Sequence, residues 1–122
     1  MHKLTPAQEE IMHYVWQREE CTVGDIREAI AEDRGGKKPA HSTISTLMLA
    51  LLDRGFLHHR QYGRTFVYTP AVSKEAYGRR SLGELIGSFF GGSPALAVSH
   101  LVKQENLNLE ELNDLVRKLE EE

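Results

Sequence analysis

The sequence predicts a mainly α-helical protein that contains one small β-hairpin. Apolar residues between positions 44 and 52 recur at spacings of three, one, three and one, which is the period of one helix face. They are Ile44, Leu47, Met48, Leu51 and Leu52. Gly55 follows as a C-terminal cap, and two β-prone runs, 56–60 and 65–69, flank the turn Tyr62-Gly63-Arg64. A helix followed at once by a basic hairpin is the outline of a winged helix-turn-helix.

Two further helices are expected before this segment. Thr5-Pro6-Ala7-Gln8 opens the first, with Thr as N-cap, Pro at the first helical position and Gln completing a capping box. Its apolar stripe is Ile11, Met12, Val15 and Trp16. Thr22 caps the second helix with Asp25 at its third position, and Ile26, Ala29 and Ile30 face inward. A basic turn over 33–39 then leads to the third helix, over 40–54.

Residues 71–122 are expected to form three amphipathic helices, a dimerisation domain that follows a winged DNA-binding domain over residues 1–70. Gly91-Gly92 separates the first from the second helix, and Ser93 and Asn108 start the second and third. About fifty residues in three helices bury their own apolar faces poorly. We therefore expect these faces to pair with a second copy, the alternative being that they fold back on the winged domain. The interface is expected to contain Leu82, Leu85, Ile86, Phe89, Phe90, Leu101, Leu112, Leu115, Val116 and Leu119.

The composition is ordinary for a soluble globular protein, with 122 residues of which 40% are hydrophobic and 27% charged. The longest apolar run, 47–52, is far shorter than the roughly 20 residues that span a bilayer. Residues 1–20 hold four glutamates and no apolar core, so no signal peptide is expected and cytoplasmic residence is the default. Cys21 is the only cysteine, which excludes an internal disulfide framework.

The net charge of −3 conceals a basic region. Between Arg34 and Arg64, six Lys and Arg residues stand against Asp53 alone, a local net charge of +5. Screening confines each charge to about 8–10 Å, so clustering matters more for phosphate attraction than the total. A solvated surface is the alternative interpretation. Because the cluster coincides with the predicted third helix and hairpin, we favour double-stranded DNA as the partner.

The amino-terminal turns of the third helix are expected to face base edges in the major groove. Hydroxyl groups there can hydrogen-bond several bases, and a threonine methyl can touch a thymine methyl. Base or phosphate contacts are expected from Ser42, Thr43, Ser45 and Thr46. Ser42 could instead cap the helix. Phosphate contacts are expected from Lys38, His41 and Tyr62, and contacts with phosphates or with the minor groove from Arg60 and Arg64. Phe66 and Tyr68 are expected in the core.

No metal site, cofactor or catalytic centre is expected. His58 and His59 are neighbours in a strand, so they point to opposite faces and cannot easily chelate one ion. The sequence contains no Ser/His/Asp motif, paired-carboxylate constellation or glycine-rich phosphate loop. The protein is therefore not expected to be an enzyme.

Four segments carry a resemblance to a known family: LTPAQEEIMHYVW near the start, STISTLMLALLDRGFL in the third helix, GRTFVYTP in the hairpin and LEELNDLVRKLEE at the end. They resemble the penicillinase repressors, the BlaI/MecI/CopY type of winged-helix regulator. The resemblance covers essentially the whole chain. It implies a homodimeric bacterial repressor that binds a pseudo-palindromic operator through helix 40–54 and wing 56–69. It also places Thr43, Ser45 and Thr46 where the family's recognition helix meets bases.

The chain departs from the family at two places that bear on induction. Copper-responsive members carry a Cys-rich C-terminal motif, whereas this chain has no cysteine after Cys21. Members that control β-lactam resistance are cleaved by a sensor protease at an Asn-Phe pair in the fifth helix, where this chain has Ser99-His100. The operator, the regulated genes and the inducing signal stay open. So do two alternatives, a ligand-sensing regulator of similar architecture and a winged-helix protein-interaction module.

Overall fold

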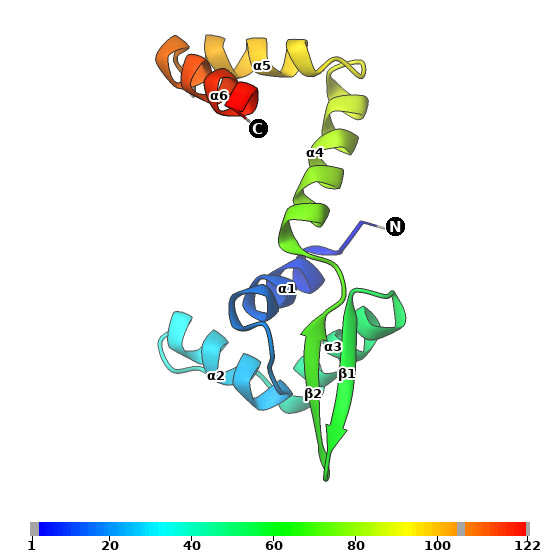
Figure 1. Ribbon diagram of the computed structural model, residues 1–122. Helices are drawn as coiled ribbons and strands as arrows, with labels where there is room; N and C mark the ends of the chain where they lie inside the picture. The colour runs from blue at the N-terminus through cyan, green and yellow to red at the C-terminus, as the bar shows by residue number, and fades with distance from the viewer. Residues whose placement is uncertain (1–2, 105–106, 122) are drawn as a thin grey trace. The chain divides into compact units, whose positions relative to one another are not determined.

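The computed structural model describes residues 3–104 and 107–121 (Figure 1). In chain order, its elements are α1 (Pro6–Arg18), α2 (Val23–Asp33), α3 (His41–Asp53), β1 (Leu57–Tyr62), β2 (Thr65–Pro70), α4 (Lys74–Phe89), α5 (Pro94–Lys103) and α6 (Leu109–Glu121). The predicted class, mainly α with one hairpin, is confirmed. The chain divides into two compact units, one that ends at Gly78 and one that begins at Arg79.

Short-range hydrogen bonds start the first two helices as predicted. The Thr5 hydroxyl accepts from the Gln8 backbone N–H at 3.2 Å, and the Gln8 side-chain oxygen accepts from the Thr5 N–H at 3.1 Å. Thr22 and Asp25 form the same reciprocal pair at 3.1 and 2.9 Å. Each capping box satisfies two backbone N–H groups that the helix itself cannot. The third helix starts differently, since its N-cap is Ala40 and no side chain caps it. The Ser42 hydroxyl is therefore not used as a cap.

One hydrophobic core holds the three helices and the base of the hairpin together. The α1 stripe contributes Ile11, Met12 and Val15, while Trp16 packs at its edge. From α2 and α3 come Ile26, Ile30, Ile44, Met48 and Leu51. Phe56, Leu57 and Tyr68 close the core from the hairpin. The predicted inward faces of all three helices are confirmed.

The hairpin pairs from Leu57 with Pro70 at its base to Tyr62 with Thr65 at its tip. Gly63 and Arg64 make the two-residue turn, and Gly63 has a φ of +62°, which glycine adopts without steric cost. Tyr62 thus belongs to β1 and not to the turn. The prediction that Phe66 lies in the core is wrong: its strand continues past the core, so Phe66 is 41% exposed whereas Tyr68 is buried.

A backbone bridge ties the hairpin to the segment between α1 and α2. The Cys21 N–H donates to the Tyr68 carbonyl at 3.0 Å, and the Tyr68 N–H donates to the Cys21 carbonyl at 2.7 Å. The Cys21 thiol is buried against this bridge, and burial raises its pKa to about 11. A thiol that stays protonated is a poor nucleophile. Cys21 is therefore a packing residue.

The first unit extends past the boundary expected at residue 70 because α4 begins inside its core. The Tyr77 hydroxyl accepts from the buried Leu4 N–H at 3.1 Å. The Tyr77 ring lies 5.8 Å from Phe56 and 5.9 Å from Trp16, measured between centroids. The Trp16 indole N–H donates to the Val72 carbonyl at 2.8 Å. Residues after the hairpin therefore complete the winged unit before the second unit begins.

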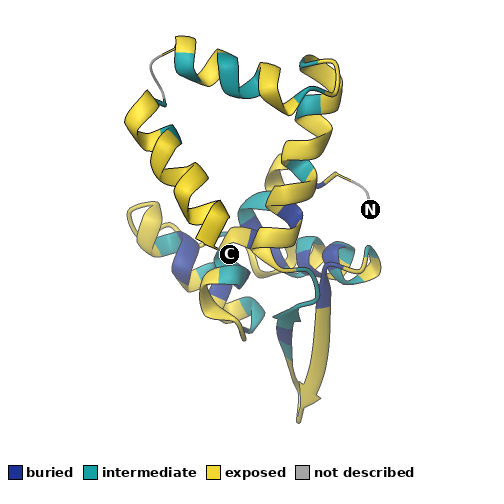
Figure 2. Cartoon of the chain, turned by 45° about the horizontal axis from the view of Figure 1, so that its top comes forward, coloured by how far each residue is buried: buried dark blue, intermediate teal, exposed yellow. Residues whose placement is uncertain are grey.

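The second unit consists of helices whose apolar faces are open to solvent. The starts predicted at Ser93 and Asn108 are confirmed, since Ser93 accepts from the Leu96 N–H at 3.1 Å and Asn108 from the Glu111 N–H at 2.8 Å. Neither α5 nor α6 has a buried residue, as the absence of dark blue on them shows (Figure 2). The exposed large apolar residues here are Leu82, Leu85, Phe89, Leu96, Leu101, Leu109, Leu115, Val116 and Leu119. Of the other expected interface residues, Ile86, Phe90 and Leu112 are half-buried, and Phe90 lies just beyond α4.

None of the described helices is by itself long and apolar enough to cross a membrane. α4 and α5 meet the length and composition of a span only when they are taken together, and they are bent by 87° at the break between them.

Removing one hydroxyl should test the role of Tyr77. Tyr77→Phe is expected to lower the free energy of unfolding by about 1–3 kcal/mol, because it leaves the buried Leu4 N–H without an acceptor. Urea unfolding followed by the fluorescence of Trp16, the single tryptophan, measures this. Tyr62→Phe is the matched control, since Tyr62 is exposed and, among the described residues, its hydroxyl hydrogen-bonds only with Arg60. Loss of this hydroxyl should change stability by less than about 0.5 kcal/mol. Equal stability of Tyr77→Phe and the unaltered protein would contradict the assignment.

Candidate nucleic-acid interface

One side of α3 is buried and the other presents hydroxyl groups. Ile44, Met48 and Leu51 face the core. The four hydroxyl residues of the first two turns form what we call the hydroxyl face, which comprises Ser42, Thr43, Ser45 and Thr46. Ser42, Thr43 and Thr46 are exposed and Ser45 is half-buried. Hydrogen-bonding groups without a cap or core role are thus available on the helix that sequence patterns predicted to meet bases.

A groove joins the amino-terminal turns of α3 to the tip of the hairpin. It has a volume of about 320 Å³. Its lining residues are Thr22, Val23, Gly24, His41, Ser45, Arg64, Thr65, Phe66 and Tyr68. The structure therefore brings together three of the predicted contact residues, His41 and Ser45 from α3 and Arg64 from the hairpin turn.

Two contributions to this groove were not predicted. The start of α2, over 22–24, lines it, and helix N-termini carry partial positive charge that favours anions. The capping box at Thr22 identified that helix start in the sequence, but no sequence pattern placed it beside α3. Phe66 also lines the groove, because the strand carries it beyond the core.

Arg60 and Tyr62 lie apart from this groove, on the other face of the hairpin. Side chains alternate along a strand, so both share a face with His58, whereas Phe66 lies on the face of Leu57 and Tyr68. The Arg60 guanidinium donates to the Tyr62 hydroxyl at 3.1 Å. Both residues line a second hollow with Glu20, His58 and Thr69. Arg60 and Tyr62 are thus separated from His41 and Arg64, which line the first groove.

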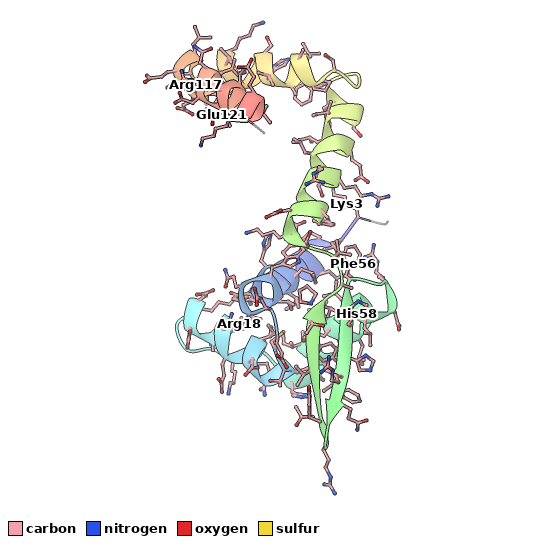
Figure 3. The ribbon with its side chains drawn as sticks, viewed as in Figure 1. Lys3, Arg18, Phe56, His58, Arg117 and Glu121 are labelled. Atoms are coloured by element: carbon pink, nitrogen blue, oxygen red, sulfur yellow. The ribbon has the colours of Figure 1, made fainter. Side chains whose placement is uncertain are left out.

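His58 and His59 point to opposite faces of β1, since they pair with Thr69 and Tyr68, and His58 is labelled on this strand in Figure 3. The His59 ring lies 5.1 Å from Phe66 and 6.0 Å from Tyr68. Within residues 3–104 and 107–121, no group of three or more His, Cys, Asp or Glu side chains could hold a metal ion.

Several basic side chains of the cluster have partners within the protein, so fewer of them are available to DNA than the sequence suggests. Arg34 forms an ion pair with Glu10, and the Lys38 ammonium lies 3.8 Å from a Glu28 carboxylate oxygen. Arg54 donates to the Lys3 carbonyl at 2.8 Å and to the Gln8 side chain, and its guanidinium lies over the Phe56 ring. In the part of the chain that the structure describes, the cluster members without an ion-pair partner or such a structural role are Lys37, Arg60 and Arg64. The α3 helix contains no Lys or Arg.

Comparison with known proteins identifies the family of this chain. The sequence model of the family described as "Penicillinase repressor" matches residues 4–121. The penicillinase repressor of Bacillus licheniformis is 26% identical over 119 residues, which cover 98% of this chain and 91% of that protein. The methicillin resistance regulatory protein MecI of Staphylococcus aureus is 23% identical over 114 residues, covering 93% of this chain and 90% of that protein.

Solved structures are similar in fold. The solution structure of the DNA-binding domain of the repressor BlaI matches with a TM-score of 0.52 and 28% identity, covering 63% of this chain and 94% of that one. The oxidized form of MarR from E. coli matches over 98% of this chain and 75% of that one, with a TM-score of 0.52 and 14% identity, a likeness that concerns the fold alone. The family match over nearly the whole chain shows that this protein belongs to the penicillinase repressors, a family of winged-helix, DNA-binding transcriptional repressors.

Proposed function

We propose that this chain represses transcription as a homodimer that occupies a pseudo-palindromic operator and blocks RNA polymerase. The observation that carries the proposal is the groove that brings His41 and Ser45 of α3 together with Arg64 at the tip of the hairpin. The other hydroxyl residues of the same helix, Ser42, Thr43 and Thr46, are exposed. An α-helix fits the major groove of B-DNA, and its amino-terminal residues then meet base edges. The hairpin beside it would follow the adjoining phosphate backbone.

Different residues would serve positioning and sequence reading. Arg64 at the hairpin turn, without an ion-pair partner among the described residues, suits a phosphate or the minor groove. His41, at the start of α3, suits a phosphate beside the amino terminus of that helix. Thr43, Ser45 and Thr46 present hydroxyls that suit base edges. Lys38 could contribute only after leaving Glu28, and Arg60 and Tyr62 only through the other face of the hairpin.

Dimerisation would come from α4, α5 and α6. Nine of their large apolar side chains are exposed in the single chain, and large exposed apolar patches mark interaction sites. A two-fold dimer presents two copies of α3 to two half-sites, which matches the symmetry of a pseudo-palindrome. Binding one half-site then raises the effective concentration of the second recognition helix at the other.

A gel shift with the gene's own upstream region, repeated across a range of salt concentrations, tests the proposal. Repression predicts a discrete complex whose affinity falls steeply with salt, because phosphate contacts release counterions. A protein-interaction module would show no such salt-sensitive affinity. A ligand-sensing regulator would show it, and would in addition respond to a small molecule. Sequencing DNA fragments that co-purify with the protein would identify the operator.

Paired substitutions should separate positioning from sequence reading. Arg64→Ala is expected to weaken binding to all DNA sequences about equally, and to reduce the slope of log affinity against log salt concentration by about one unit. Thr46→Ala should cost about 1–3 kcal/mol of binding free energy at the base pair it contacts, and so reduce the preference for the operator. Fluorescence anisotropy with operator and random duplexes measures both. Arg18→Ala, an exposed arginine at the end of α1, is the control for lost charge. If Thr46→Ala leaves the ratio of affinities for operator and random DNA unchanged, the placement of α3 against base edges is wrong.

Shortening the chain should abolish dimerisation without unfolding the winged unit. A chain that ends at Arg80 keeps Val72 and Tyr77, which a chain ending at Pro70 would lose together with their contacts to Trp16 and Leu4. It is expected to sediment as a monomer and to lose most operator affinity, because binding at one half-site no longer raises the effective concentration of a recognition helix at the other.

In the full chain, Leu115→Asp should have the same effect by burying a charge in the dimer interface. Arg117→Asp is the matched control on α6, where Arg117 is labelled in Figure 3 and pairs only with Asp114 among the described residues. A full-length protein that sediments as a monomer at micromolar concentration would contradict the dimer.

If this chain were induced by proteolysis as the family members that control β-lactam resistance are, the cut would fall near Ser99 and His100 in α5 and would detach α6 from the DNA-binding unit. The pair itself, however, is a poor match for a protease selective for Asn-Phe, because an aromatic pocket gains less apolar burial from imidazole than from phenyl.

We therefore expect this chain to resist a β-lactam-type sensor protease and to be induced by another protease or another signal. Co-expression with such a sensor, followed by mass spectrometry of the chain, should return the intact mass. A variant that combines Ser99→Asn with His100→Phe is the positive control and should be cut. Fragments of the unaltered protein that end at Ser99 would contradict the expectation.

A further inference from the structure

Large apolar side chains are exposed at only a few places in the first unit. Among the residues described up to Gly78, those places are Leu49, Tyr62 and Phe66, with exposed fractions of 49%, 51% and 41%. Leu49 lies on α3, and the other two lie on the hairpin. A single exposed apolar residue is ordinary on a protein surface. Here, however, all three lie on the two elements proposed to contact DNA, and none on α1 or α2.

Leu49 continues the hydroxyl face toward the middle of α3. It follows Thr46 by three residues and Ser45 by four, the spacings that put side chains on one side of a helix. Its neighbour Met48 is fully buried, so the boundary between core and solvent runs between these two residues. Three residues rise about 4.5 Å along a helix axis. That is a little more than one base-pair step of roughly 3.4 Å.

The chemistry of Leu49 restricts what it can recognise. Its side chain has no hydrogen-bond donor or acceptor, and the apolar group that base pairs present in the major groove is the C5-methyl of thymine. The α3 helix has no Lys or Arg to reach guanine in the bidentate manner. Sequence reading by this helix therefore depends on short hydroxyl groups and on apolar contact.

We infer that Leu49 is a specificity-determining residue, which selects thymine by packing against its C5-methyl at the base pair next to the one that Thr46 faces. The inference rests on the proposed function, since it requires α3 to lie in the major groove. It extends the reading surface beyond the amino-terminal turns of the helix, and it predicts at least one thymine in each half-site that is required for its methyl group and not for its hydrogen bonds.

Replacing thymine with uracil removes that methyl and nothing else, so it provides the test. An operator is first selected from random duplexes with the full-length protein. Each thymine of one half-site is then replaced in turn by uracil, and affinity is measured for the unaltered protein, Leu49→Ala and Leu49→Met. With the unaltered protein, uracil in place of one particular thymine is expected to lower the affinity about fourfold. This factor corresponds to the free energy of burying one methyl group. Leu49→Met keeps an apolar side chain and should keep this sensitivity.

Leu49→Ala should bind the thymine and uracil operators equally well at that position. Leu49 is half exposed, so this variant should fold, and circular dichroism with thermal melting checks that it does. If Leu49→Ala stays as sensitive as the unaltered protein to every uracil replacement, the inference is overturned while DNA binding stands. If no sequence is enriched by the full-length protein, the proposed function is overturned and this inference falls with it.

Discussion

The DNA-binding unit depends on the packing of the hairpin base against α3. Leu57 and Tyr68 are buried in the same core as Met48 and Leu51, and the backbone bridge between Tyr68 and Cys21 holds the second strand to the segment before α2. These contacts fix the hairpin relative to α3 from its base, while its tip extends past the core. The groove that combines His41, Ser45 and Arg64 exists because of this anchoring, and a loosely attached hairpin would not keep Arg64 beside the helix.

Several basic side chains of this unit have partners within the unit itself. Arg34 joins α2 to α1 through Glu10, and Arg54 joins the end of α3 to the start of α1. Those side chains are already engaged, and the recognition helix is without Lys or Arg. Such an arrangement limits the sequence-independent part of binding, which comes from phosphate contacts. Under the proposed function, hydroxyl and apolar groups would then discriminate between operators, and the joint action of two half-sites would supply the overall affinity.

The second unit differs, since many of its large apolar side chains are exposed in the single chain. No residue of α5 or α6 is buried in the single chain, and a unit of this size has too little interior to cover three amphipathic helices. Association with a second copy would satisfy that constraint and at the same time supply the symmetry that a pseudo-palindromic site requires. Under the proposed function, the same hydrophobic surface thus couples the stability of the second unit to DNA affinity.

The sequence alone determined the local features: the capping boxes at Thr5 and Thr22, the buried stripe of α3 and the turn at Gly63, because each depends on hydrogen bonds or periodicity within a few residues. Family membership was also readable from it. Only the tertiary structure decided that Phe66 leaves the core, that Arg34, Lys38 and Arg54 have partners, and that Tyr77 completes the first unit. Those outcomes depend on where distant segments meet, and Leu4 and Tyr77 are joined by a contact that no local pattern encodes.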